Sequence, residues 1–128
     1  MIKERLNKNF LDEFKEYDFS QIQENQIYLV GSARFKEYFI KIESILQILY
    51  DKIVYVCSID GLLNKDKFSP NEWEKLQEIA LRKLQNQDAM LVLDVNNYIG
   101  EHSLEEIEMF TKRYNKPIYY LSKLRKNL

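Results

Sequence analysis

One stretch of the sequence decides the fold: Ala89-Met90-Leu91-Val92-Leu93-Asp94. Five consecutive apolar residues predict a strand that is covered on both faces, as the strands of parallel sheets are. A similar run over residues 26–30 ends at Gly31, and shorter apolar runs occupy residues 53–57 and 118–121. The chain therefore carries four candidate strands, of which two have the composition of buried central strands.

Helical segments separate these strands. Apolar residues recur at helical spacing over residues 2–17 and 35–49, and two further helices are predicted after Ser69 and from Ser103 to about Tyr114. Ser69 and Ser103 are each followed three residues later by a glutamate, which is the spacing of a capping box. Strands that alternate with helices predict one parallel sheet with right-handed crossovers and helices on both faces.

The predicted fold class is α/β, a doubly wound, flavodoxin-like parallel sheet of order 2-1-3-4 with room for a fifth strand. Residues 1–128 are expected to form a single domain, with residues 1–20 as an extra N-terminal helix. In this order the first and third strands are neighbours whose connections leave to opposite faces, and ligands bind beyond the carboxyl ends of such strands. The loops over residues 31–35 and 95–102 are therefore predicted to converge on one site.

Composition excludes several classes of protein. The 128 residues are 45% hydrophobic and 30% charged, which is the balance of a globular domain, and 19 basic against 20 acidic residues give a net charge of −1. Such a balance argues against a nucleic acid polymer as partner, because gripping a phosphate backbone needs a basic surface. No apolar run approaches the roughly 20 residues that span a bilayer, and residues 1–5 lack the apolar core of a signal peptide. We therefore predict a cytoplasmic protein without a membrane partner.

The single cysteine, Cys57, and the single histidine, His102, restrict the possible chemistry. One cysteine excludes an internal disulfide and a cysteine-cluster metal site, and one histidine cannot build a His-rich site. Cys57 lies within an apolar run, where a buried and inert thiol is the expected state. We predict neither a metal site nor a cofactor.

The first candidate site segment follows the first strand, at Gly31, Ser32, Arg34 and Phe35. A strand–turn–helix junction of this kind directs free backbone N–H groups into the crevice, while Ser32 adds a hydroxyl and Arg34 a cationic fork. This combination suits a phosphate or a sugar. The alternative is an ordinary turn with Ser32 as helix N-cap, and these residues taken alone favour that alternative.

The second candidate segment, residues 94–106, brings carboxylates, amides, a phenol and an imidazole to the end of the third strand and the start of the next helix. Its candidate residues are Asp94, Asn96, Tyr98, Gly100, Glu101, Ser103 and Glu106. Each of these residues also has a structural alternative. Glu106 has the spacing of a capping-box residue, and Asp94 at the end of a strand could cap its own loop. Tyr98 could cover the core. Each residue alone favours its structural role, whereas the expected meeting of the two loops favours a site.

The same segments carry a resemblance to a known family. Residues 98–108, followed by Asn115-Lys116-Pro117, resemble the signature of proteins related to nucleoside 2-deoxyribosyltransferases, which carry a glycine, a small hydroxyl residue and a glutamate before a Gly-Lys-Pro turn. Residues 30–36 are similar to the first strand and turn of that group, and residues 87–92 to the strand before its catalytic loop. The resemblance spans most of residues 26–122.

This resemblance implies an enzyme that transfers or hydrolyses the N-glycosidic bond of a nucleoside or nucleotide. Glu106 matches the family's nucleophile, and a carboxylate suits an oxocarbenium-like transition state. Asp94 or Glu101 would then protonate the departing base. Ser103 would lie at the helix terminus near the sugar or phosphate, and Ser32 and Arg34 match the turn that meets a 5′-phosphate in the nucleotide hydrolases.

The chain also departs from the family pattern. Phe110 stands where the family has alanine, one helical turn after the glutamate, and Asn115 replaces the glycine of the Gly-Lys-Pro turn. Glu105, Glu106 and Glu108 crowd one helix start, so the sequence leaves open which carboxylate faces the site. These changes affect the expected pocket and substrate more than the fold.

Two other function classes remain open from the sequence. The chain could be a non-catalytic nucleotide-binding or sensing module of the same fold, or a structural interaction domain. The resemblance also implies a homodimer or a higher homo-oligomer. Phe39, Trp73 and Phe110 are the aromatic residues considered for its contact face.

Overall fold

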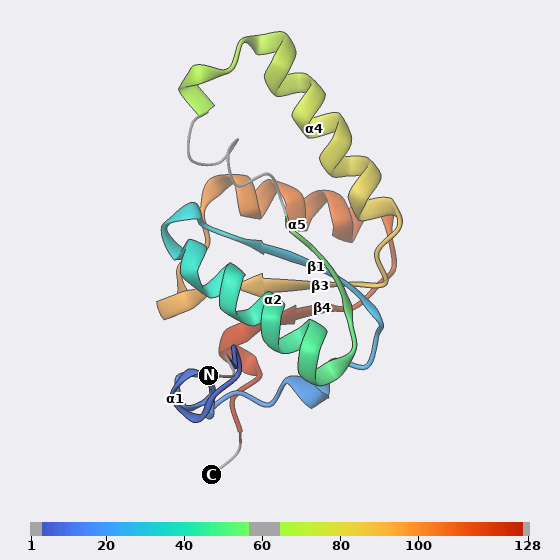
Figure 1. Cartoon of the computed structure of the whole chain (residues 1–128). Coiled ribbons are helices and arrows are strands. Elements are labelled where there is room, and N and C mark those ends of the chain that lie inside the picture. Colours follow the sequence, from blue (N-terminus) through green and yellow to red (C-terminus); the bar gives the residue numbers. More distant parts are fainter. Residues whose placement is uncertain (1–3, 57–64, 127–128) are drawn as a thin grey trace.

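A computed structural model describes residues 4–56 and 65–126 of the chain. Strands β1 (Gln26–Gly31), β2 (Ile53–Val56), β3 (Ala89–Leu93) and β4 (Ile118–Tyr120) form one all-parallel sheet of order β2-β1-β3-β4 (Figure 1). This order confirms the predicted flavodoxin-like α/β class and the adjacency of the first and third strands.

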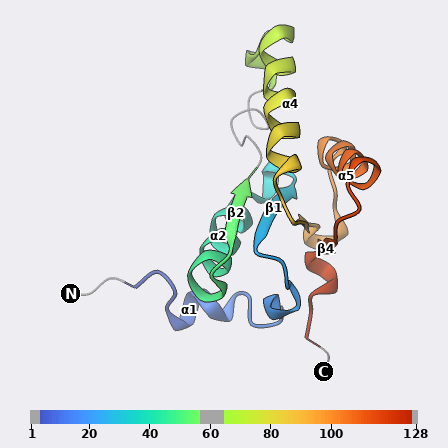
Figure 2. The same ribbon diagram turned by 90° about the vertical axis from the view of Figure 1, so that its right-hand side faces the viewer.

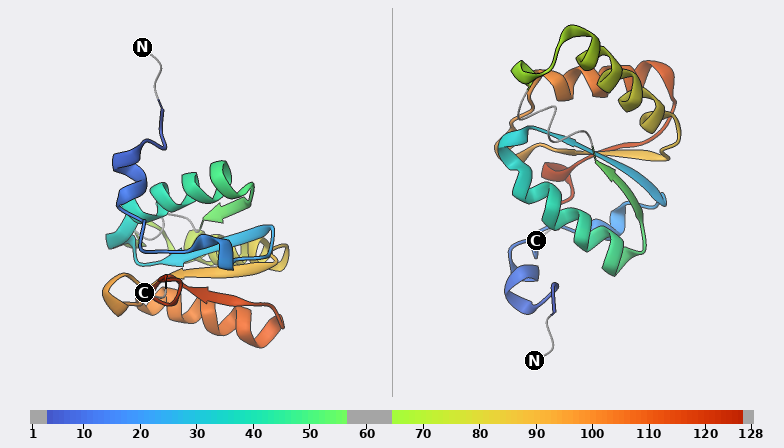
Figure 3. Two further views of the ribbon diagram at one scale, coloured as in Figure 1. Left: turned by 90° about the horizontal axis from the view of Figure 1, so that it is seen from below. Right: turned by 45° about the horizontal axis from the view of Figure 1, so that its top comes forward.

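Helices cover both faces of this sheet, as predicted. Helix α2 (Lys36–Tyr50) lies on one face, and α4 (Pro70–Gln85) and α5 (Glu101–Arg113) lie on the other (Figures 1 and 3). The two central strands β1 and β3 are buried along nearly their whole length because they receive helices from both sides.

Helix α4 begins as its sequence predicts. The Ser69 hydroxyl oxygen accepts a hydrogen bond from the Glu72 N–H (3.2 Å), and the Glu72 carboxylate accepts one from the Ser69 N–H (2.8 Å). Pro70 is the first helical residue, where its missing N–H costs nothing. The capping box at Ser69 is therefore confirmed.

The N-terminal prediction is wrong in extent. Residues 1–20 were expected to hold one helix with its periodicity over 2–17, but only α1 (Lys8–Asp12) is an α-helix among the described residues of this segment. Beyond it the chain turns toward the C-terminal segment, where the Asp18 N–H donates to the Leu124 carbonyl (2.7 Å). Three aromatic side chains of this segment are buried: Phe10, Phe14 and Phe19. Burial of these rings and pairing of the backbone with the C-terminal segment stabilise the folded chain more than a longer N-terminal helix would.

Two further observations bear on the sequence predictions. In the described part of the chain, no helix combines the length and the apolar character needed to cross a membrane. Cys57 and the side chain of His102 lie outside the described residues.

Candidate functional site

The candidate site begins where β1 and β3 end side by side. Gly31 pairs with Leu93 in the strand register. A methyl group on Gly31 would lie 3.1 Å from the Leu93 Cβ and 3.2 Å from the Phe39 Cζ, closer than carbon atoms normally approach. The glycine is therefore required for close packing of the strand ends against α2, and its φ is not in the left-handed region.

The turn after β1 is held by its own serine. The Ser32 hydroxyl oxygen accepts a weak hydrogen bond from the Arg34 N–H (3.4 Å), and the Ser32 carbonyl accepts one from the Phe35 N–H (3.0 Å). These bonds close the 3₁₀ turn η2 (Ala33–Phe35), whereas α2 itself begins without a side-chain cap. Ser32 thus forms the turn, as the alternative of an ordinary turn predicted, but its hydroxyl bonds within η2 and does not cap α2.

The two predicted loops meet, and the contact is made by side chains. The Arg34 guanidinium carbon lies 4.1 Å from the centroid of the Tyr98 ring, which is the geometry of a cation–π contact. The Phe35 ring meets Tyr98 edge to face, with centroids 6.1 Å apart. A methyl group on Gly100 would lie 3.9 Å from the Ser32 Cβ, so the start of α5 also reaches this turn. The convergence inferred from the strand order is confirmed.

A tight turn between β3 and α5 brings Tyr98 to this position. Asn96 and Asn97 have φ values of 55° and 62°, in the left-handed region that asparagine tolerates better than most residues. The Tyr98 N–H donates to the Val95 carbonyl (3.0 Å), which closes the turn. Asn96 and Tyr98 are both exposed, and the Tyr98 ring lies against Arg34.

Asp94, a candidate acid, is engaged elsewhere. It is buried at the end of β3, and its two carboxylate oxygens accept hydrogen bonds from Ser122, one from the N–H (2.9 Å) and one from the hydroxyl (2.6 Å). Ser122 lies in the 3₁₀ turn η5 (Leu121–Lys123) after β4. This carboxylate therefore ties the ends of β3 and β4 together, and no pattern in the sequence indicated Ser122 as its partner.

Helix α5 does not begin where its capping signature predicts. It starts at Glu101, with Gly100 as the N-cap residue, and the Leu104 N–H already donates to the Gly100 carbonyl (3.0 Å). The prediction that Ser103 is the N-cap is therefore wrong. Ser103 is instead the third helical residue and is buried, so the packing of α5 places it inside the first turn and not at the N-cap. Glu106 is consequently the sixth helical residue and lies too far along the helix to cap it.

Glu106 is a carboxylate of α5 that the fold partly shields from water. Its side chain is partly buried, and burial raises the pKa of the carboxyl group to about 7. The Lys83 ammonium on α4 acts in the opposite direction and Glu105 adds to the rise in pKa. Within residues 4–56 and 65–126, no hydrogen bond to the Glu106 carboxyl group is formed. Lys83, which also donates to the Val56 carbonyl at 3.5 Å, carried no signal in the sequence.

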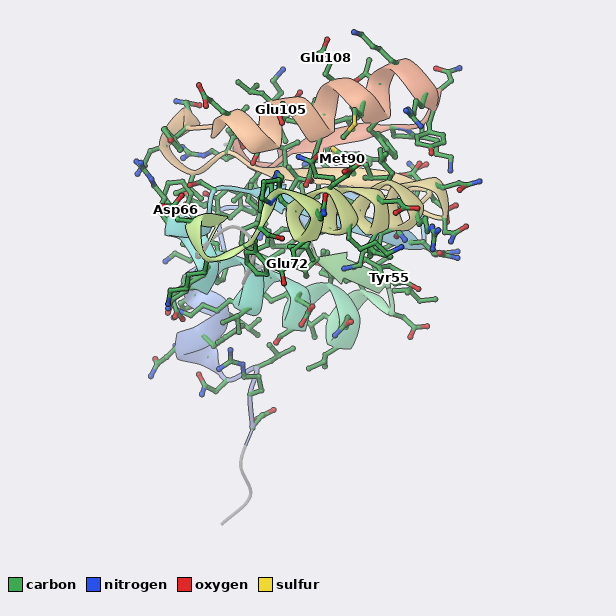
Figure 4. The ribbon with its side chains drawn as sticks, turned by 90° about the horizontal axis from the view of Figure 1, so that it is seen from above. Tyr55, Asp66, Glu72, Met90, Glu105 and Glu108 are labelled. Carbon is green, nitrogen blue, oxygen red and sulfur yellow. The ribbon has the colours of Figure 1, made fainter. Side chains whose placement is uncertain are left out.

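The neighbouring carboxylates face solvent. Glu108 is exposed and forms an ion pair with Lys112 (2.7 Å), whose hydrogen bond lowers the pKa of Glu108, and Figure 4 shows it projecting from α5 away from α4. Glu101 and Glu105 are also exposed. Of the three glutamates that the sequence could not distinguish, Glu106 is the one turned toward the protein interior.

One departure from the family pattern, Phe110, and the lysine of the turn after α5, Lys116, both have structural roles. Phe110 is completely buried and its ring lies 5.5 Å from that of Tyr114, so it belongs to the core beneath α5. Lys116 donates to the carbonyls of Gln85 (3.3 Å) and Gln87 (2.6 Å), which holds the end of α4 at the amino edge of the sheet. Because Phe110 and Phe39 are core residues, they are wrong as candidates for an intermolecular contact face.

Comparisons of the chain with family models, with curated proteins and with solved structures give no match. In the described residues, no group of three or more histidine, cysteine, aspartate or glutamate side chains is arranged to hold a metal ion.

Proposed function

We propose that the chain is a cytoplasmic enzyme related to the nucleoside 2-deoxyribosyltransferases, which transfers or hydrolyses the N-glycosidic bond of a nucleoside or nucleotide. One observation carries the proposal: the single interior carboxylate among the crowded glutamates of α5 is Glu106, the residue that matches the family's nucleophile. The start of the same helix meets Ser32, Arg34 and Tyr98.

The placement along α5 suits a ligand of nucleoside size. Glu106 lies five residues, or about 8 Å along the helix axis, beyond Glu101. A phosphate or sugar hydroxyl at the N-terminus of α5 would meet backbone N–H groups and the positive end of the helix dipole. Arg34 would add its charge there, while the Tyr98 ring offers a flat surface for stacking.

In the proposed reaction the Glu106 carboxylate attacks C1′ of the sugar. The C1′–N bond breaks, its electron pair leaves with the base, and a proton from an acid or from water neutralises that base. Water or a second base then attacks C1′ and releases Glu106. Because both oxygens of Asp94 are engaged by Ser122, the exposed Glu101 is the better-placed of the two candidate acids.

The pKa of Glu106 sets a condition on this mechanism. A carboxyl group with a pKa of about 7 is half ionised at neutral pH, and only the ionised form can attack. Lys83 favours that ionised form. The rate of base release should therefore rise with pH through about 7 and then level.

The decisive experiment measures release of free base from a panel of deoxynucleosides and deoxynucleotides by chromatography. Wild type is compared with Glu106→Gln and with the matched control Glu105→Gln, whose side chain is exposed on the same helix turn. Loss of base release in Glu106→Gln alone supports the proposal. Equal rates in all three proteins would exclude Glu106 as the nucleophile, and a selective loss in Glu105→Gln would assign the reaction to the other carboxylate.

A non-catalytic nucleotide-binding module is the second candidate. The observation that favours it is the engagement of Asp94, which leaves the departing base with only an exposed acid. A module of this kind would bind a nucleotide, measured by calorimetry, with no base released by wild type over long incubation.

A further inference from the structure

The N-terminal segment, residues 4–22, lies outside the parallel sheet and outside the helices α2, α4 and α5 that cover it. Figure 2 shows its helix α1 beside α2, on the side away from α5. Three of its aromatic rings are buried, and Glu13 forms an ion pair with Lys41 of α2 (2.8 Å). The segment is therefore packed onto α2, although residues 26–122, which carry the family resemblance, do not include it.

Aromatic rings continue from this segment to the candidate site. Phe14 meets Tyr38, in the first turn of α2, edge to face with ring centroids 5.6 Å apart. The Tyr38 ring lies 6.3 Å from the Phe35 ring, and Phe35 meets Tyr98 edge to face at 6.1 Å. These spacings are those of favourable aromatic pairs. We call the four residues Phe14, Tyr38, Phe35 and Tyr98 the ring series.

The ring series ends at Arg34, whose guanidinium carbon lies 4.1 Å from the centroid of the Tyr98 ring. We call Arg34 and Tyr98 the cation–π pair. Both side chains are exposed, and an exposed arginine side chain occupies many rotamers unless a neighbour restricts it. Phe35 is partly buried and contacts both Tyr98 and Tyr38, so the packed end of the series restricts the exposed end.

We propose that Phe14 and Tyr38 are positioning residues of the candidate site, which act through Phe35. They hold the cation–π pair in the orientation in which it receives the ligand. This role rests on the proposed function, in which Arg34 and Tyr98 contact the substrate. It makes the N-terminal segment, which supplies Phe14, part of what shapes the site.

The place of the cation–π pair predicts which kinetic parameter changes. In the proposed function the pair holds parts of the nucleotide that lie away from the reacting C1′ atom. Contacts of this kind stabilise the bound substrate and the transition state alike, so their loss raises KM and leaves kcat unchanged. Loss of the nucleophile Glu106, in contrast, lowers kcat.

Helix α2 supplies a matched control. Tyr50, its last residue, is partly buried like Tyr38 and contacts Phe19 of the N-terminal segment, with ring centroids 6.3 Å apart. It lies about 18 Å along the helix axis from Tyr38, at the opposite end of α2 from Phe35. Phe14 and Phe19 are also alike in burial, at 4% and 3% exposed. Each variant of the ring series therefore has a counterpart elsewhere in the contact between α2 and the N-terminal segment.

The first measurement needs neither ligand nor activity. Protons of the Arg34 side chain lie over the Tyr98 ring, whose ring current displaces their NMR resonances upfield from those of free arginine. We expect Tyr38→Leu and Phe14→Leu to move these resonances toward the free values. Tyr38→Phe, which keeps the ring, should leave them in place, as should the controls.

The controls are Tyr50→Leu and Phe19→Leu. Each removes a ring from the contact between α2 and the N-terminal segment and leaves the ring series intact. Circular dichroism melting of every variant shows whether it is folded at the temperature of the measurement. Where Tyr38→Leu does not fold, Phe14→Leu with its control Phe19→Leu carries the same test.

The second measurement is KM and kcat for base release from the best deoxynucleotide of the panel. Tyr38→Leu should raise KM about fivefold, the effect of one aromatic pair, with kcat changed by less than about twofold. Tyr38→Phe should restore the wild-type KM, and Tyr50→Leu should keep it.

Arg34 resonances that stay in place in both Tyr38→Leu and Phe14→Leu would overturn the proposal. So would an equal displacement in Tyr50→Leu, or a KM that Tyr38→Leu leaves unchanged in an active enzyme. A wild-type chain that releases no base contradicts the proposed function alone, because the resonances decide the positioning role without substrate.

Discussion

Two carboxylates near the carboxyl edge of the sheet differ in their hydrogen bonding. At the end of β3, Asp94 accepts hydrogen bonds on both oxygens from Ser122. In the second turn of α5, Glu106 is turned inward without a hydrogen bond to any described residue, and burial raises the pKa of its carboxyl group to about 7. The first arrangement stabilises the fold, while the second leaves a carboxyl group partly buried without a compensating hydrogen bond, which costs free energy.

The largest expected difference between the two regions is in activity. Glu106→Gln should lower the turnover for base release by at least about a thousandfold, because an amide cannot form the glycosyl ester. Asp94→Asn should change turnover far less, once rates are corrected for the folded fraction. The measurement is the turnover number of each variant on the best substrate of the panel. A larger loss in Asp94→Asn would reverse the roles that we assign.

For stability we expect the opposite order, with the larger loss on replacement of Asp94. Asp94→Ala should lower the free energy of unfolding by about 2–4 kcal/mol, because it leaves the Ser122 N–H and hydroxyl unpaired near a buried strand end. Ser122→Ala removes only the hydroxyl bond and should cost about 1 kcal/mol. Urea unfolding of both variants measures this difference, and a neutral Asp94→Ala would show that the pair does not hold β3 to β4.

The raised pKa of Glu106 predicts how stability varies with pH. Below its ordinary pKa of 4.5, the group is protonated in both the folded and the unfolded chain. As pH rises from about 4.5 to about 7, the unfolded chain releases this proton first, so the folded state loses stability, on the order of 2 kcal/mol after allowance for partial exposure.

Glu106→Gln removes this pH dependence. The variant should match wild type near pH 4.5 and be more stable than wild type at pH 8. Glu105→Gln is the comparison, because it removes only the smaller contribution of Glu105 to the Glu106 pKa and should keep most of the slope. Urea unfolding at a series of pH values measures it. Identical slopes in wild type and Glu106→Gln would contradict the burial that we describe.

The smallest expected effects concern the two segments with the spacing of a capping box, Ser69 to Glu72 and Ser103 to Glu106. Ser69→Ala should lower stability by about 1 kcal/mol, because the Ser69 hydroxyl accepts from the Glu72 N–H. A capping glutamate can be replaced by glutamine but not by alanine without loss of its hydrogen bond. Because α5 begins at Glu101, Glu106 is not a cap, and Glu106→Ala should lose no capping hydrogen bond that Glu106→Gln keeps. Thermal melting of these three variants would show whether the two matching patterns have different structural meanings.

Those serines also show where sequence reasoning succeeds. The pattern Ser69, Pro70 and Glu72 is local, and the structure reproduces it. The same spacing at Ser103 fails because the helix begins at Glu101, so that Ser103 lies buried inside its first turn and Glu106 lies in its second. Local spacing does not record that burial, which makes Glu106 a partly buried carboxylate and not a cap.

The sequence by itself determined the strands, their parallel order and the meeting of the two loops, because apolar runs and crossover handedness depend on little else. Only the tertiary structure decided three matters. Ser122 donates hydrogen bonds to the Asp94 carboxylate, and Lys83 lies near Glu106. The N-terminal helix ends at Asp12, after which the chain meets the C-terminal segment. Each is a contact between residues distant in sequence. Their energies depend on burial and on partners that no local pattern records.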